Sequence, residues 1–70
     1  MGAYVNLTSG RVYTGLQVRS GLLLQMMEDE KELECCRQFL GKEPDEHVTM
    51  ADMSNYLENT KWNVVSLDMY

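Results

Sequence analysis

With 70 residues and a formal net charge of -5, the chain is short and acidic. A chain of this length makes one domain with a small core, because it buries only about 60% of the surface that it exposes when unfolded. The negative charge disfavours general binding to nucleic-acid phosphates, and no apolar run approaches the roughly 18 residues that a membrane span needs.

Charge and cysteine are unevenly placed along the chain. Residues 1–27 carry a charge of +2, residues 28–58 carry -7 and residues 59–70 are neutral.

The adjacent Cys35 and Cys36 cannot bridge to each other within a helix without gross distortion, which favours a reducing compartment. Since the N-terminus has no basic-then-apolar signal pattern, we expect a cytoplasmic protein. Self-association, as a homodimer, is the remaining way for so small a core to gain stability.

The segment Tyr4–Val18 predicts a β-hairpin. Ser9 and Gly10 form a two-residue loop in which glycine supplies a positive φ, and alternating side chains flank that loop. Closing the turn there pairs Leu7 with Val12. The face predicted to enter the core consists of Ala3, Val5, Leu7, Val12, Thr14, Leu16 and Val18. The face predicted to meet solvent consists of Tyr4, Asn6, Thr8, Arg11, Tyr13, Gln17 and Arg19.

One resemblance covers the hairpin alone. The first motif of Sm-like RNA-binding proteins is similar to the spacing, in this chain, of Val5, Leu7, Gly10, Arg11, Tyr13 and Gly15. In the Sm motif an Asp and an Asn follow this segment, but the present chain lacks both residues at the corresponding positions after Val18. It also lacks the second Sm motif. The resemblance therefore implies no functional residue in this chain.

The six residues Leu22–Met27 fit either a third strand or the first turns of a helix, because periodicity does not separate the two for a short apolar run. The Ser-Gly pair before them favours a strand, and the absence of β-branched residues favours a helix. We expect a helix, with Leu22 and Met26 continuing into a stripe that includes Leu33, Cys36 and Leu40.

Two later segments carry helix signals. Asp29–Glu32 has the form of a capping box, and Gly41 is a natural residue for the end of the helix that follows. After a connector over residues 42–48, Thr49 and Asp52 open a second helix that runs to about Asn59. Its predicted apolar stripe consists of Met50, Met53, Tyr56 and Leu57.

The end of the chain, Lys61–Tyr70, predicts a strand, because Val64 and Val65 have strong β-propensity. This strand is expected to join the hairpin. The predicted fold is therefore a single α+β domain over residues 1–70, with an N-terminal antiparallel hairpin, two helices, and a C-terminal strand that completes a small antiparallel sheet.

Residues that could carry chemistry are few. His47 has the carboxylates of Asp45 and Glu46 beside it, but a solvated connector gives a general base little shelter. Cys35 and Cys36 lack the two further ligands that a zinc site needs, so we expect buried thiols. The sequence therefore predicts no catalytic residue, no metal and no cofactor, and we expect a protein that is not an enzyme.

Two surfaces remain as candidates for binding. Arginine and aromatic side chains, which are enriched at interface hot spots, occur on the predicted solvent face of the sheet at Tyr4, Arg11, Tyr13, Arg19 and Trp62. The second surface is the acidic side of residues 28–34, with Glu28, Glu30 and Glu34. We expect an intracellular modulator or inhibitor that binds a protein partner, for which a basic one is the natural choice. The alternative is a nucleic-acid-binding module that uses the Tyr/Arg face.

Overall fold

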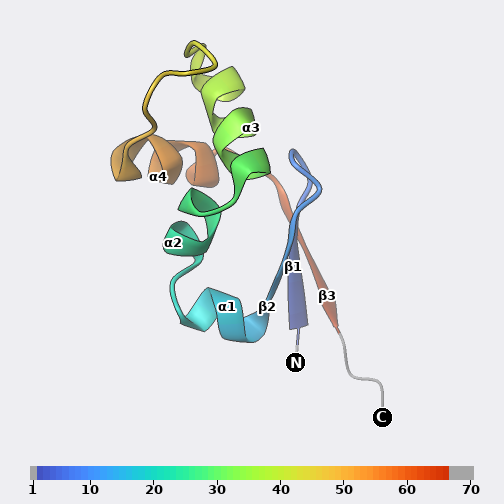
Figure 1. Ribbon diagram of the computed structural model, residues 1–70. Helices are drawn as coiled ribbons and strands as arrows, with labels where there is room; N and C mark the ends of the chain where they lie inside the picture. The colour runs from blue at the N-terminus through green and yellow to red at the C-terminus, as the bar shows by residue number, and fades with distance from the viewer. Residues whose placement is uncertain (1, 67–70) are drawn as a thin grey trace.

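The computed structural model describes residues 2–66. A three-stranded antiparallel sheet has the order β2-β1-β3. Its strands are β1 (Gly2–Asn6), β2 (Val12–Thr14) and β3 (Trp62–Ser66). The helices are α1 (Gly15–Arg19), α2 (Leu22–Met27), α3 (Glu30–Leu40) and α4 (Met50–Glu58), and they lie to one side of the sheet (Figure 1). The α+β class and the joining of the C-terminal strand to the hairpin are confirmed, with four helices instead of two.

The hairpin has a wider loop than predicted. Val5 pairs with Val12, two positions away from the expected register. The Asn6 amide donates to the Arg11 carbonyl at 2.9 Å, so residues 7–10 form the loop. The cause is the Asn6 side chain, whose Oδ1 accepts from the Thr8 amide at 2.9 Å and thereby folds the chain before Ser9. Gly10 has the positive φ that the sequence predicted, at 78°.

The two faces of the hairpin have exchanged roles. A shift of two residues keeps the same side chains together, but the face with Asn6 and Tyr13 is the one that the helices cover. Leu7 and Val12, predicted to enter the core, are exposed, Val12 by 56%. The prediction of an apolar inner face is therefore wrong for Leu7 and Val12, because a buried hydrogen-bond cluster described below holds the polar face inward, whereas Ala3 is buried as predicted.

The second strand ends at Thr14, not at Val18. Thr14 caps α1: its hydroxyl accepts from the Gln17 amide at 3.2 Å, and the Gln17 side chain accepts from the Thr14 amide at 2.8 Å. This reciprocal capping box turns the chain into a helix. Leu16 and Val18 consequently belong to α1 and not to the sheet.

Leu22–Met27 is a helix, as expected, but α2 does not continue into α3. Asp29 has extended backbone and caps α3 by accepting from the Lys31 amide at 2.9 Å. Gly41, at a φ of 70°, ends α3 as predicted. The capped junction divides the predicted continuous helix into two, yet Met26 of α2 still reaches the core.

The start of α4 is as predicted. Thr49 and Asp52 form a reciprocal capping box. Met53 and Tyr56 are buried, whereas Met50 is exposed and does not extend the apolar stripe. The part of the predicted C-terminal strand beyond Ser66 lies outside the described residues. The core is formed by Tyr13, Met26, Cys35, Cys36, Val48, Met53 and Tyr56.

Candidate functional site

A buried carboxylate lies at the centre of the molecule. Glu32 of α3 is fully buried, and its Oε2 accepts from the Tyr13 hydroxyl at 2.6 Å. Its Oε1 accepts from the Tyr56 hydroxyl at 3.1 Å. The Asn6 side-chain nitrogen donates to both oxygens, at 3.0 and 3.1 Å. The sequence prediction missed this cluster, although Glu32 stands three and four residues before Cys35 and Cys36 and therefore lies on their buried face of α3.

Each polar atom of this buried cluster has a partner. The Asn6 nitrogen also donates to the Tyr56 hydroxyl at 3.2 Å, and the Asn6 oxygen accepts from the backbone of the hairpin loop. Burial, reinforced by the Glu32 carboxylate, raises the pKa of Tyr13 and of Tyr56 above the ordinary value of tyrosine. Since its members are almost wholly shielded from solvent, the cluster joins β1, β2, α3 and α4 structurally and is closed to a substrate.

The predicted Tyr/Arg surface does not form. Tyr13 is only 3% exposed, and Tyr4 and Trp62 are half-buried. Trp62 packs against Tyr13 with ring centroids 5.9 Å apart. The indole nitrogen of Trp62 is buried without a hydrogen-bond partner among the described residues. Tyr13 and Trp62, which were expected to stack on bases or on a partner, therefore pack against each other and against the core.

The two arginines of that predicted surface lie apart. The Arg11 Nε donates to the Asp29 carboxylate at 2.8 Å, which ties the hairpin to the start of α3. Arg19 is exposed in the last turn of α1. Arg11 is therefore engaged within the molecule, and Arg19 forms no common patch with it.

The acidic candidates do lie on the surface. Glu28, Glu30 and Glu34, which we call the acidic surface, are exposed at the α2–α3 junction and along α3. Glu34 lies 3.8 Å from Lys31. Among the described residues, Glu28 and Glu30 have no ion-pair partner. The structure therefore leaves most of the negative charge of this surface facing solvent.

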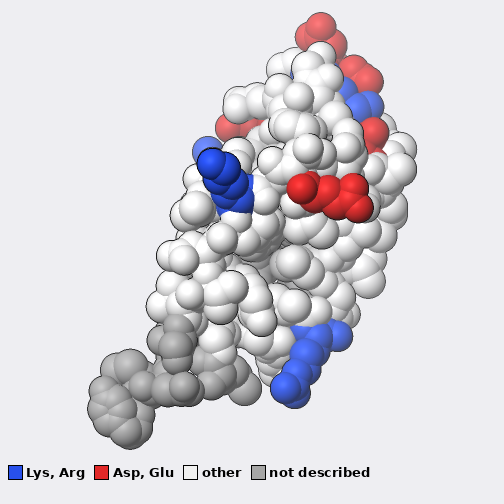
Figure 2. Space-filling view, turned by 180° about the vertical axis from the view of Figure 1, so that it is seen from behind, with Lys and Arg blue, Asp and Glu red and all other residues white. Residues whose placement is uncertain are grey.

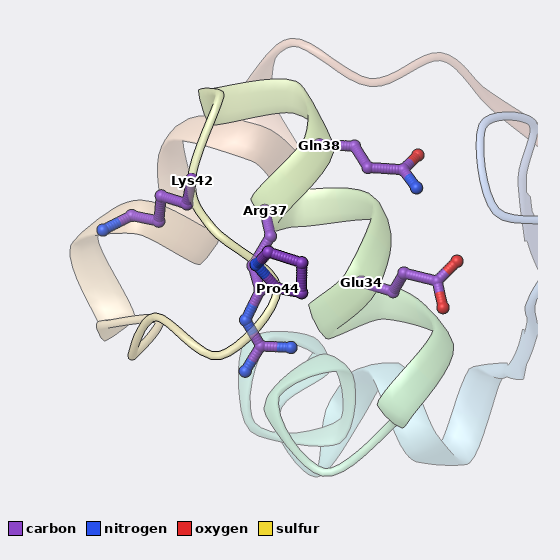
Figure 3. Close-up of a pocket in the computed structure, with 5 residues that line it drawn as sticks. All are labelled: Glu34, Arg37, Gln38, Lys42 and Pro44. Carbon is purple, nitrogen blue, oxygen red and sulfur yellow. The ribbon is translucent and has the colours of Figure 1, made fainter.

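A shallow pocket adjoins α3. It has a volume of about 250 Å³ and is lined by Glu34, Arg37, Gln38, Lys42 and Pro44. Figure 3 shows that Lys42 points away from Glu34 and Gln38. Lys42 is instead paired with Glu46 at 3.1 Å and with Asp52 at 3.2 Å. The polar groups around the pocket thus do not converge on one point, as a catalytic site requires.

The residues considered for chemistry lie separately. His47 is exposed in the connector, while Cys35 and Cys36 are buried free thiols whose pKa burial raises. Within residues 2–66, no three His, Cys, Asp or Glu side chains are placed to hold a metal ion. None of the described helices is long and apolar enough to cross a bilayer.

Comparison of the chain with protein-family models, curated proteins and solved structures gave no match. The resemblance of the hairpin to the first Sm-like motif therefore has no support from a family match. What this molecule does must be argued from its own surfaces.

Proposed function

We propose that the chain is a non-enzymatic protein-interaction module that modulates or inhibits a basic partner by occupying its surface. The observation that carries the proposal is the acidic surface, where Glu28 and Glu30 are exposed and unpaired among the described residues. Complementary charge on a partner would raise the association rate and select against acidic competitors.

The distribution of cations supports this choice. Arg11, Lys31 and Lys42 form ion pairs within the molecule. The Arg37 Nε donates to the Glu46 carbonyl at 2.8 Å. In Figure 2, acidic side chains also gather where the C-terminal end of α3 meets the connector, so negative charge is not confined to the acidic surface. A negative field at the helical end favours a basic partner over nucleic acid.

The acidic surface is also held in place. Asp29, between Glu28 and Glu30, caps α3 and accepts from Arg11. Glu30 and Glu34 are one helical turn apart and so lie on the same side of α3. Because the backbone beneath these carboxylates is fixed before any partner arrives, little ordering cost is added on binding.

The test compares two triple variants with equal net charge. The first changes Glu28, Glu30 and Glu34 to Gln. The control changes Glu43→Gln, Asp45→Asn and Glu58→Gln, which are also exposed acids. Wild type and both variants are immobilised and exposed to the same cell extract, retained proteins are identified, and their association rates are measured over a range of salt concentrations.

We expect that a basic protein from the extract binds to wild type and to the control variant. It should not bind to the variant in which Glu28, Glu30 and Glu34 are changed to Gln. Its association rate with wild type should fall as salt rises, and the first variant should show a shallower dependence. Equal losses in the two triple variants would show that net charge alone matters, and retention by all three would rule out the acidic surface.

A further inference from the structure

Among residues 2–66, the strand β3 has an edge that no other strand pairs with, and it carries apolar side chains on both faces. Val64 is 61% exposed and Val65 is 41% exposed, although neighbouring residues of a strand point to opposite faces. The strand Trp62–Ser66 contains no charged residue. Figure 1 shows β3 at the side of the sheet away from the helices, and no described helix or strand covers its outer edge. Proteins usually protect such an edge with charge, proline or a covering element.

The backbone groups on this edge can be assigned from the pairing with β1. The Leu7 amide donates to the Lys61 carbonyl at 2.9 Å, which marks Leu7 and Lys61 as a hydrogen-bonded pair. In an antiparallel ladder such pairs alternate, so Asn63 and Val65 also direct their backbone groups toward β1. Trp62, Val64 and Ser66 therefore direct their N–H and C=O groups outward.

The β2 edge of the sheet is less accessible to another strand than the β3 edge. By the same alternation, Val12 and Thr14 of β2 direct their backbone groups outward, because Asn6 and Arg11 are hydrogen-bonded across the hairpin. The Thr14 amide, however, donates to the Gln17 side chain at 2.8 Å. A three-residue strand that turns directly into a helix offers little for another strand to pair with.

We propose that β3 is the seam of a homodimer, in which β3 of a second copy pairs with it in antiparallel register. With Val64 opposite its own counterpart, Trp62 lies opposite Ser66 of the other copy. All residues that direct hydrogen-bonding groups outward then meet as hydrogen-bonded pairs. The two sheets become one continuous six-stranded sheet, twice the three strands of one copy, with both sets of helices on the same side.

A second copy fits this edge by symmetry, and the uncharged strand Trp62–Ser66 places no like charges at the seam. The pattern of outward groups at Trp62, Val64 and Ser66 is symmetric about Val64, so an isologous two-fold pair satisfies all of them. The acidic surface lies on α2 and α3 and not on β3. The acids of two copies therefore repel each other mainly at long range, and salt screens this repulsion over roughly 8 Å. A small domain also gains the apolar burial that its own core lacks.

The test uses proline on each edge of the sheet. Val64→Pro removes an outward N–H without breaking the ladder to β1, and Val12→Pro makes the same change on the β2 edge. The dimer dissociation constant is measured by sedimentation equilibrium of the full chain, with circular dichroism as a check of folding. Val64→Pro should weaken the dimer about 25-fold, because two inter-copy hydrogen bonds are lost and each is worth about a factor of five.

Val12→Pro should change the dissociation constant by less than about twofold, since it lies on the edge that the dimer leaves free. Should Val64→Pro fail to fold, Val64→Lys places two like charges opposite each other at the two-fold axis and should likewise weaken the dimer. A wild-type chain that remains monomeric at millimolar concentration overturns the proposal, and so does a dimer that only Val12→Pro weakens.

Residue-resolved amide exchange gives an independent readout. The amides of Trp62, Val64 and Ser66 should be protected only at concentrations where the dimer forms, whereas those of Asn63 and Val65 should be protected at every concentration. Uniform exchange along β3 would overturn the seam. The dimer should also strengthen as salt rises, while binding through the acidic surface should weaken, so the two proposals can fail separately.

Discussion

The two faces of the sheet invert the usual relation between polarity and burial. The inner face presents Asn6 and Tyr13, both buried, to the carboxylate of Glu32. The outer face presents Leu7 and Val12, both exposed, although Ala3 on the same face is buried. The difference teaches that complete hydrogen bonding decides which face can be buried here, because a polar group with all its partners satisfied loses little on leaving water.

The largest effect is expected when the centre of the inner face is removed. Glu32→Ala leaves two tyrosine hydroxyls and the Asn6 amide without their acceptor and opens a cavity, so unfolding free energy should fall by about 4 kcal/mol. Glu30→Ala, on the exposed side of the same helical turn, should change it by less than about 0.5 kcal/mol. Urea denaturation measures both, and similar losses would contradict the cluster.

A smaller change removes one donor. Tyr13→Phe keeps the ring that packs on Trp62 and removes the hydroxyl that donates to Glu32 at 2.6 Å. A hydrogen bond to a charged group contributes about 2 kcal/mol, and denaturation should show a loss of that order. Tyr4→Phe serves as the control, since no hydrogen bond of its hydroxyl is present among the described contacts. Equal stability of the Tyr13 variant and wild type would place that hydroxyl in water.

The raised pKa of Tyr13 and of Tyr56 predicts a loss of stability in alkali. A tyrosine with an ordinary pKa of 10.0 ionises in the unfolded chain while the buried one stays neutral, so the stabilisation is complete below pH 10 and falls above it. Each tyrosine should contribute a loss of about 1.4 kcal/mol for each pH unit above 10. Denaturation at a series of pH values should give a shallower fall for Tyr13→Phe, and a flat profile in the wild type would contradict the burial.

The hairpin loop should give the smallest effect that can be measured. Gly10 has a φ of 78° and no atom within 4 Å of an added Cβ, so Gly10→Val is opposed by backbone conformation alone. We expect a cost of about 1–2 kcal/mol. Thermal denaturation measures it, with Ser9→Ala as a control at the neighbouring loop position, and a variant that melts like wild type would disprove the left-handed conformation.

The sequence predicted those parts of the fold that short-range signals determine. Gly10, Gly41 and the Thr49–Asp52 capping box act within a few residues of themselves, and each is in place. The Thr14–Gln17 capping box is an equally local signal, but the alternation of apolar residues through Val18 concealed it.

The candidate site was predicted only in part, for a physical reason. Glu28, Glu30 and Glu34 lie on the surface, as the helix pattern indicated. The burial of Glu32 and Tyr13 depends instead on hydrogen bonds between residues 19, 24 and 26 positions apart. Periodicity records which side chains share a face, but it does not record which face receives a distant partner.

The inversion of the two faces is tested most directly by solvent paramagnetic relaxation. A soluble gadolinium complex is added to the folded protein, and the relaxation of the Val12 methyl protons is compared with that of the Tyr13 ring protons. With Val12 56% exposed and Tyr13 3% exposed, the Val12 methyls should relax strongly and the Tyr13 ring should be nearly unaffected. Strong relaxation of Tyr13 with protection of Val12 would restore the apolar inner face that the alternation predicted and would contradict the buried cluster.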